Sequence, residues 1–121
     1  MSNAEELVQA FVSVWNERDP ARRAATVRRL WAADGRHLMG AQDIRGHDAL
    51  EERVAASHRR NVIEKDYVFR PATAIDTLPG VTKFSWDMAL RETGEVVSAG
   101  VGFLVVGDDG HIVCDYLFVD S

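Results

Sequence analysis

Asp115 is the carboxylate whose position in this chain best suits chemistry. It lies in an apolar run in which alternate residues share one face, so Val113, Leu117 and Val119 lie on its side of the predicted strand. A buried carboxylate is costly, so Asp115 must be hydrogen-bonded, paired with a cation or protonated with a raised pKa. A raised pKa suits a general base that works near neutral pH. The alternative is that Asp115 pairs with a nearby Arg or Tyr and has a structural role only.

Two histidines lie where they could exchange a proton with a ligand. His37 shares one side of a short predicted strand with Met39, and His58 ends an apolar stripe that includes Leu50 and Val54 on a predicted helix. Imidazole gains and loses a proton near neutral pH, which makes both histidines catalytic candidates. An inward-facing histidine is also often a core residue whose hydrogen bonds are all made, and that alternative stays open.

A metal site is not expected. The histidines at positions 37, 47, 58 and 111 lack the paired spacing of metal ligands, and the single cysteine, Cys114, lies on the opposite strand face from Asp115. The chain also has no glycine-rich phosphate loop and no nucleophile motif, and no cofactor is expected.

Large apolar side chains fall on the same predicted sheet face as Asp115 and on the first helix. They could bind an apolar ligand, or they could simply fill the core. Gly100 and Gly102 lie on this face without side chains, which favours a cavity or the close approach of another group. The candidates for ligand binding are Phe84, Trp86, Met88, Phe11, Trp15, Met39 and Leu117.

The elements that must position these residues begin with helices. Residues 4–16 carry apolar side chains at four-residue spacing, and residues 20–31 form a second helix that starts at the Asp19-Pro20 pair. Residues 33–35, Ala-Asp-Gly, are expected to stop that helix. The next predicted elements are a short strand over residues 36–39, a polar loop over 40–46 and a third helix over about 47–60.

The second half of the chain predicts strands. Residues 81–92, 95–106 and 111–119 are rich in Val, Phe, Trp and Tyr and are separated by Gly/Asp turns, which is typical of an antiparallel meander. Residues 66–75 are also extended. Pro71 places that strand at an edge or at a bulge, because proline cannot donate to a sheet ladder. Helices ahead of an antiparallel sheet predict an α+β fold in which the helices cover one sheet face.

The composition predicts a single domain over residues 1–121. A net charge of −5 argues against nucleic acid as a partner, because phosphate binding needs a cationic surface. No apolar run approaches the ~20 residues that cross a membrane, and the chain does not begin with a signal-peptide pattern. A single cysteine cannot form an internal disulfide. These features predict a cytoplasmic protein without a membrane partner.

The order of these elements and several short motifs resemble the nuclear transport factor 2-like superfamily, and within it the SnoaL-like and ketosteroid isomerase-like branch. The motifs are Trp31-Ala-Ala-Asp34, Arg45-Gly-His-Asp-Ala-Leu50 and Gly110-His-Ile-Val113. The resemblance covers nearly the whole chain. It implies a cone-shaped α+β barrel, in which three N-terminal helices pack on a curved antiparallel sheet around a cavity. It also implies a homodimer formed through the outer sheet face.

The resemblance also implies which residues face the cavity. Matching the turns at Gly94 and Gly110 to the family places His37 on a strand that lines the cavity and turns Cys114, Tyr116 and Phe118 outward. The residues that it turns inward are Phe84, Trp86, Met88, Asp115, Leu117 and Val119.

The same match argues against one specific activity. The positions that carry the catalytic groups of ketosteroid isomerases fall at Met39, Gly102 and about Phe11, and none of these residues can do acid–base work. The chain is therefore not expected to be a true ketosteroid isomerase.

The candidate residues and the resemblance together predict a small-molecule site. The leading hypothesis is a cofactor-free isomerase, dehydratase or cyclase that acts on a small hydrophobic carbonyl compound. In it, Asp115 is the base, His37 a proton shuttle or hydrogen-bond donor and His58 a second donor. The alternatives are a non-catalytic domain that binds a small molecule, and a dimerisation domain whose own side chains fill the cavity.

Overall fold

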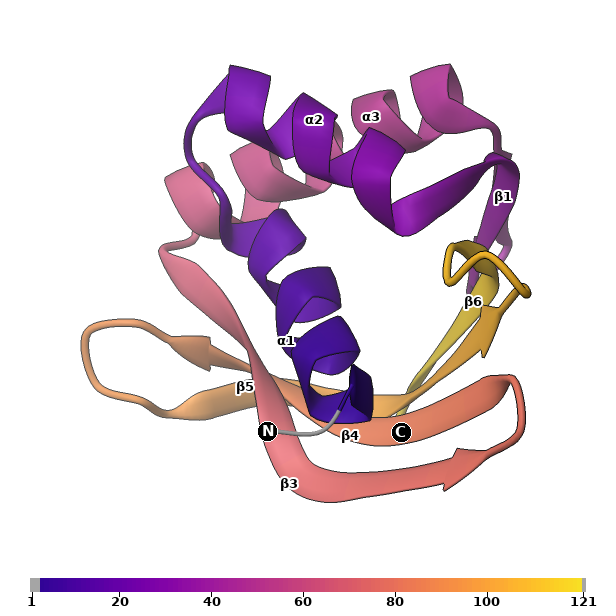
Figure 1. Cartoon of the computed structure of the whole chain (residues 1–121). Coiled ribbons are helices and arrows are strands. Elements are labelled where there is room, and N and C mark those ends of the chain that lie inside the picture. Colours follow the sequence, from indigo (N-terminus) through magenta and orange to yellow (C-terminus); the bar gives the residue numbers. More distant parts are fainter. Residues whose placement is uncertain (1–2, 121) are drawn as a thin grey trace.

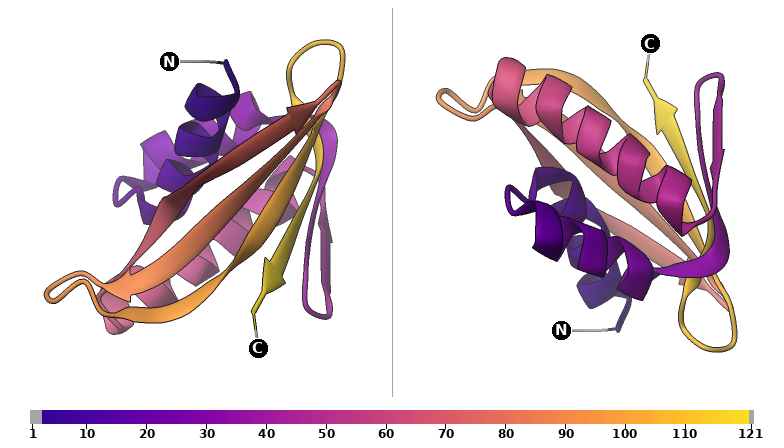
Figure 2. Two further views of the ribbon diagram at one scale, coloured as in Figure 1. Left: turned by 90° about the horizontal axis from the view of Figure 1, so that it is seen from below. Right: turned by 90° about the horizontal axis from the view of Figure 1, so that it is seen from above.

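The helices lie on one side of a curved sheet (Figure 1, Figure 2). The computed structural model describes residues 3–120, apart from the side chains of residues 72 and 73. Helices α1 (Asn3–Asn16) and α2 (Pro20–Leu30) begin where the sequence predicted. Asp19 caps α2, because its Oδ1 accepts hydrogen bonds from the backbone N–H groups of Ala21 at 2.9 Å and Arg22 at 3.2 Å.

The strand after α2 is longer than predicted. Trp31 has an extended backbone, with φ −92° and ψ 145°, and β1 spans Trp31–Met39. Residues 33–35, predicted to stop the helix, therefore lie inside the strand. The cause is a tertiary contact, since Trp31 is fully buried and pairs with Ile112 at the far end of the chain.

The loop predicted over residues 40–46 contains a short strand, β2 (Gln42–Arg45), which pairs with β1 as an antiparallel hairpin. Gly40 makes the turn with a φ of 59°, a left-handed conformation that favours glycine. Across the hairpin, Arg36 Nη2 lies 2.8 Å from Asp43 Oδ2. The strand is mostly polar and exposed, so it lacks the apolar alternation that would have predicted it.

The third helix is longer than predicted and changes its winding. Helix α3 (His47–Ser57) continues as a π-helix, η1 (His58–Glu64), where the sequence predicted an end near residue 60. Asn61 Nδ2 donates a hydrogen bond to Ser57 Oγ at 3.1 Å across the junction between the two helices. π-Helical turns are frequent at functional sites.

One six-stranded sheet has the order β2-β1-β6-β5-β4-β3. β1 runs parallel to β6 and the other pairs are antiparallel, so the sheet is mixed and not purely antiparallel. β3 lies at an edge, and its pairing with β4 shifts between Pro71 and Ile75, as the proline predicted. The remaining strands are β3 (Tyr67–Leu78), β4 (Val81–Leu90), β5 (Val96–Val106) and β6 (Ile112–Val119).

Two glycines of β5 make room for aromatic rings on the inner sheet face. The register places Gly102 opposite Phe84 and Gly100 opposite Trp86. A Cβ atom on Gly102 would lie 2.5 Å from the Phe84 ring, and one on Gly100 would lie 2.7 Å from the Trp86 ring. The close approach predicted at these glycines is therefore confirmed.

Three residues of β6 depart from the faces predicted for them. Val113 is 38% exposed, because the pairing between β5 and β6 shifts near the start of β6 and places Ile112 in the core instead. Cys114, expected to face outward, is buried next to that shift. Val119, the last residue of the strand, is 49% exposed and does not line the interior.

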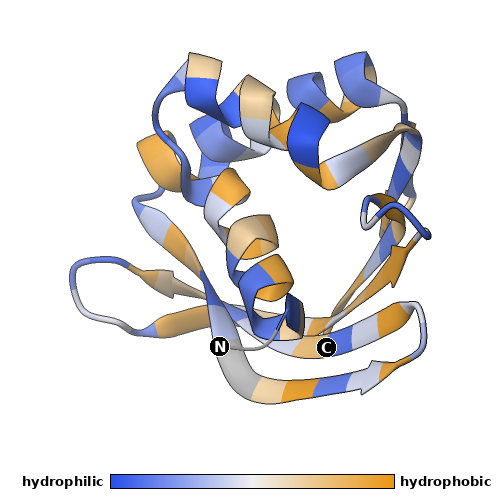
Figure 3. Cartoon of the chain, in the orientation of Figure 1, coloured by the Kyte–Doolittle hydropathy of each residue, from blue (hydrophilic) through white to orange (hydrophobic). Residues whose placement is uncertain are grey.

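The core lies between α1 and the inner sheet face. Phe11 is its centre, with ring centroids 5.6 Å from Trp31, 5.7 Å from Phe84 and 6.0 Å from Trp15. Hydrophobic residues alternate with hydrophilic ones along α1 and the strands, as expected for elements with one buried face (Figure 3). Within residues 3–120, no helix has the length and apolar character needed to span a membrane.

Candidate functional site

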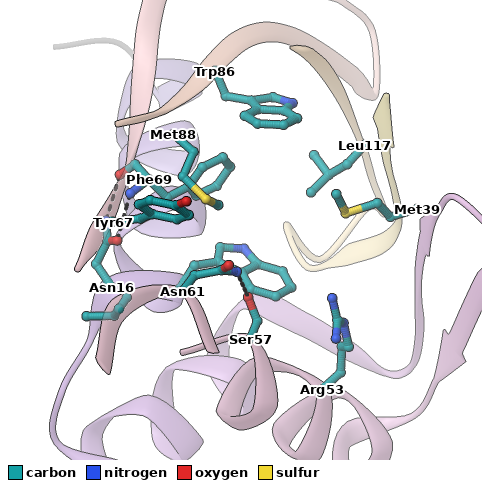
Figure 4. Close-up of a pocket in the computed structure, with 12 residues that line it drawn as sticks. Asn16, Met39, Arg53, Ser57, Asn61, Tyr67, Phe69, Trp86, Met88 and Leu117 are labelled. Carbon is teal, nitrogen blue, oxygen red and sulfur yellow. Dashed lines mark hydrogen bonds between the residues drawn. The ribbon is translucent and has the colours of Figure 1, made fainter. Parts of the chain in front are cut away.

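A small cavity of about 60 Å³ lies between the helices and the sheet (Figure 4). Helices α1, α3 and η1 contribute to one side of it, and strands β1, β3, β4 and β6 to the other. Five of the predicted ligand-binding residues line it: Trp15, Met39, Trp86, Met88 and Leu117.

The other two predicted ligand-binding residues belong to the core. Phe11 and Phe84 do not line the cavity, and both are essentially fully buried. They contact each other edge to face, at a centroid distance of 5.7 Å. Alternation along a strand or helix places a side chain on a face, but it does not say which part of that face is filled by neighbouring rings.

Asp115 and His37 form a hydrogen-bonded pair inside the fold. The parallel register of β1 and β6 sets the two residues opposite each other, and His37 Nδ1 lies 2.6 Å from Asp115 Oδ2. The other carboxylate oxygen, Oδ1, accepts a hydrogen bond of 2.9 Å from the indole N–H of Trp31. Both side chains of the pair are fully buried. The sequence placed Trp31 at the end of the second predicted helix and gave it no role at the site, although a buried indole N–H usually needs an acceptor.

Burial and hydrogen bonding act on the ionisation of Asp115 in opposite directions. Burial raises the pKa of the Asp115 carboxyl group, and the hydrogen bonds from His37 and Trp31 oppose that shift. With its Nδ1 facing the carboxyl group, His37 has one further ring nitrogen, Nε2. This atom is buried and has no hydrogen-bond partner in the part of the chain that the structure describes.

The pair lies beside the cavity and not in its lining. Met39 and Leu117, which line the cavity, are each two residues along β1 and β6 from His37 and Asp115, on the same strand faces. Trp15 also lines the cavity, and its ring centroid is 5.0 Å from that of His37. Trp15 is therefore a lining side chain in direct contact with the imidazole.

His58 is separate from this pair. It is buried at the start of η1 and does not line the cavity, although Ser57 beside it does. Burial, and then the positive charges of Arg23 and Arg18, lower the pKa of His58. The folded chain thus holds this imidazole neutral, and its stabilising contribution is lost as the pH falls through the lowered pKa.

Neither His47 nor His111 lines the cavity. His47 Nε2 donates a hydrogen bond to the backbone oxygen of Trp31 at 2.7 Å, and His111 Nδ1 lies 3.0 Å from Asp109 Oδ2 in the turn after β5. Within residues 3–120, no three His, Cys, Asp or Glu residues are grouped so that they could hold a metal ion.

Several residues of the cavity lining were not predicted from the sequence. Arg53, Ser57 and Asn61 form a stripe at four-residue spacing, beside the apolar stripe of Leu50 and Val54. The spacing itself was visible in the sequence, because a stripe beside the apolar one lies at the boundary of the core. The remaining lining residues that were missed are Asn16, Val62, Tyr67 and Phe69.

Asn16 fixes one side of the cavity. Its Nδ2 donates a hydrogen bond of 2.7 Å to the backbone oxygen of Phe69, and the backbone N–H of Phe69 donates one of 2.9 Å to Asn16 Oδ1. The end of α1 is thereby joined to β3. The amide of Asn16 is occupied in holding the scaffold, so it is less suited to binding a ligand.

No protein-family model and no curated protein matches the chain. Solved structures do match it. A putative isomerase of the SnoaL-like family from Agrobacterium tumefaciens superposes with a TM-score of 0.90 at 24% identity, over 100% of both chains. A putative polyketide cyclase from Sinorhizobium meliloti gives a TM-score of 0.70 at 14% identity, over 93% of each chain.

A third match is a nuclear transport factor 2-like protein of unknown function from Exiguobacterium, with a TM-score of 0.73 at 16% identity, over 95% of this chain and 98% of the other. At such identities the likeness is one of fold and carries no specific activity. The chain therefore has the α+β cone fold of the SnoaL-like and nuclear transport factor 2-like proteins, as the sequence predicted.

Proposed function

We propose that this protein is a cofactor-free acid–base enzyme, of the isomerase, dehydratase or cyclase type, that acts on a small and largely hydrophobic carbonyl compound. The observation that carries the proposal is the buried hydrogen bond between Asp115 and His37, which leaves His37 Nε2 without a partner. A buried carboxyl–imidazole pair is costly to maintain, and such pairs are common at catalytic sites.

The geometry supports a different division of roles from the one that the sequence predicted. Both oxygens of Asp115 are already engaged in hydrogen bonds, so Asp115 is the positioning residue in this proposal and not the base. An Nδ1–H donated to Asp115 leaves a lone pair on His37 Nε2, and that atom takes the proton from the carbon next to the substrate carbonyl. His58 has no catalytic role in this proposal, because it does not line the cavity and the charges of Arg23 and Arg18 act on it.

The lining suits an apolar substrate body. Trp86, Met88, Met39 and Leu117 surround the space, and Trp15 separates it from His37. Contact between a substrate and His37 Nε2 requires Trp15 or Met39 to shift. Methionine side chains are flexible and repack easily, so a shift of Met39 is the less costly of the two.

A second candidate function is binding without turnover. It is favoured by the finding that neither Asp115 nor His37 lines the cavity. In that case the cavity binds a small molecule, the pair stabilises the fold, and ligand affinity is nearly independent of pH between about pH 5 and 8.

Exchange of carbon-bound protons tests the catalytic proposal directly. Phenylacetone and cyclohexanone are incubated with the protein in D₂O, and the loss of their α-proton signals is followed by NMR. We expect exchange above the buffer rate for the wild type and a loss of about a hundredfold or more for His37→Gln, the size of a general-base contribution. His111→Gln is the matched control, since His111 is a half-exposed histidine in the β5–β6 turn.

Equal rates of α-proton exchange in the wild type and in His37→Gln would contradict the assignment of His37 as the base. Binding of either ketone without exchange favours the second candidate function.

We further propose that the protein acts as a homodimer in the cytoplasm. The outer sheet face supports the dimer, because Tyr116 and Phe118 are 38% and 57% exposed on it. The single cysteine supports the location.

A further inference from the structure

The lining of the cavity contains hydrogen-bond donors that have no acceptor. Three buried nitrogen atoms of lining residues lack a hydrogen-bond partner within residues 3–120: Arg53 Nε and the Nε1 atoms of Trp15 and Trp86. Each carries an N–H group that can only donate. A buried donor without an acceptor destabilises the fold, so a ligand rich in acceptor oxygens would bind favourably here.

Arg53 adds a positive charge to these donors. In the described part of the chain it makes no ion pair, and it is the only lining residue with a positive charge. Four other arginines each bind a carboxylate: Arg28, Arg36, Arg70 and Arg91.

The surroundings of Arg53 leave its charge uncompensated. Burial, and then the neighbouring charge of Arg60, lower the pKa of Arg53. An arginine nevertheless stays protonated in proteins, so the guanidinium is a half-buried cation that lacks an anion. An anionic ligand would supply the missing charge.

We propose that the cavity binds a ligand that carries a carboxylate, held by the Arg53 guanidinium, next to an apolar body that packs against Trp86, Met88 and Leu117. The planar fork of a guanidinium matches the two oxygens of a carboxylate. One cation among apolar walls fits one carboxylate, whereas a phosphate group would bring more charge than the lining neutralises. The inference rests on the proposed ligand-binding role of the cavity and narrows the substrate class to small carbonyl compounds with a carboxylate.

The position of Arg53 also orients the ligand. Its side chain extends from α3 toward Met39 and Leu117, on the opposite side of the cavity from Tyr67 and Phe69 (Figure 4). Met39 and Leu117 are the lining residues next to His37 and Asp115 along their strands. A carboxylate on Arg53 therefore lies at the end of the cavity nearest the pair, with the apolar body toward β3 and β4.

Two ligands of the same shape and different charge test this proposal. Hexanoate and hexanamide are titrated into the protein at neutral pH, with methionine methyl groups labelled with ¹³C. The chain has three methionines, and two of them, Met39 and Met88, line the cavity, so their signals report binding at this site. We expect the wild type to bind hexanoate at least about tenfold more tightly than hexanamide, which is about 1.4 kcal/mol.

Substitutions at Arg53 and Arg60 distinguish a direct contact between the ligand and Arg53 from a general effect of positive charge on ligand affinity. In Arg53→Gln, hexanoate is expected to bind no more tightly than hexanamide, and in Arg53→Lys part of the preference returns with the charge. Arg60→Gln is the matched control. It removes an exposed arginine from the same helical segment, and most of the preference for hexanoate should remain.

Three results would overturn the proposal: equal affinity of the wild type for both ligands, a preference that survives in Arg53→Gln, or no binding of either ligand. The outcomes also separate this proposal from the catalytic one. If the wild type prefers hexanoate but does not catalyse proton exchange of the ketones, the carboxylate site is supported and the catalytic proposal is contradicted. If the protein catalyses exchange but shows no preference for hexanoate, the catalytic proposal is supported and the carboxylate site is contradicted.

Discussion

Asp115 carries an energetic cost that its hydrogen bonds offset only in part. The side chain is fully buried, and burial raises its pKa against the opposing effect of His37 and Trp31. An ionised carboxylate is therefore less favourable in the folded chain than in the unfolded chain, where its pKa is about 3.9. Residues retained at such a cost are frequent at functional sites, which supports a role for Asp115 beyond folding.

This cost has a definite pH dependence. Because the folded pKa is raised, Asp115 contributes stability that is fully present below its unfolded pKa of about 3.9 and is lost as the pH rises through the folded value. We therefore expect the free energy of unfolding of the wild type, relative to Asp115→Asn, to increase as the pH is lowered from about 7 to about 4. Urea unfolding of both proteins at several pH values measures this difference.

Asp108→Asn is the matched control, since it also removes one negative charge but at an exposed position. If the free energy of unfolding of the wild type, relative to Asp115→Asn, instead decreases as the pH is lowered, the carboxylate is stabilised as an ion pair with a protonated His37. In that case the pair is structural, and His37 is no longer supported as the base.

The partners of Asp115 show which part of the site could be predicted from residues alone. Strand alternation placed Asp115 on the same face as Leu117, and the family resemblance identified that face as the inner one and placed His37 on a strand lining the same interior. The second donor, Trp31, is 84 residues away from Asp115 in the sequence, and its local neighbours favour a helix. Arg53 was missed because charged residues on a helix are usually solvated, and only the tertiary structure shows that this one lacks an anion.

Among the secondary-structure elements, the point at which α2 ends and β1 begins determines which side chains surround Asp115. Because β1 begins at Trp31 and runs parallel to β6, one strand carries both hydrogen-bond partners of Asp115: Trp31 at its start and His37 six residues later. The helices α1 and α2, the meander and the role of Pro71 were predictable, since local patterns determine them. The start of β1, the hairpin to β2 and the π-helical turn were not, because long-range contacts override local preference there.

Gly100 and Gly102 of β5 shape the inner face of the sheet. A Cβ atom at position 100 would lie 1.8 Å from the backbone oxygen of Phe118 and 2.7 Å from the Trp86 ring. Since the first of these contacts is with backbone, it cannot be relieved by a rotamer change. We expect Gly100→Ala to lower the free energy of unfolding by more than about 3 kcal/mol, measured by denaturant unfolding.

Gly107→Ala provides the comparison for this prediction. Gly107 directly follows the same strand, and the nearest atom to its added Cβ is a side-chain carbon of Val113 at 3.3 Å, which can move. We expect a loss of less than about 1 kcal/mol there. Equal losses for the two variants would show that the sheet adjusts at Gly100, and that the tight packing of Trp86 over this glycine is not required.

At the scale of the whole molecule, the sheet has two faces with different partners. The inner face is covered by the helices (Figure 2). On the outer face, the rings of Phe103 and Phe118 contact each other at 6.0 Å, and Phe118 and Tyr116 are 57% and 38% exposed. Exposed aromatic residues that cluster in this way are typical of protein interfaces. Under the homodimer proposal, a second copy of this chain covers this face.

A single substitution at this face is expected to separate the two copies. In a two-fold symmetric interface each residue occurs twice, so Phe118→Glu introduces two carboxylates and removes two aromatic rings. We expect the wild type to have the mass of a dimer by light scattering after size exclusion, and Phe118→Glu to have that of a monomer. Ile63→Glu is the matched control: Ile63 is also 57% exposed, but it lies on η1. A wild type that is monomeric throughout a dilution series, or an equal effect of both substitutions, contradicts the interface. The cavity would then function within a single chain, whose own residues line it.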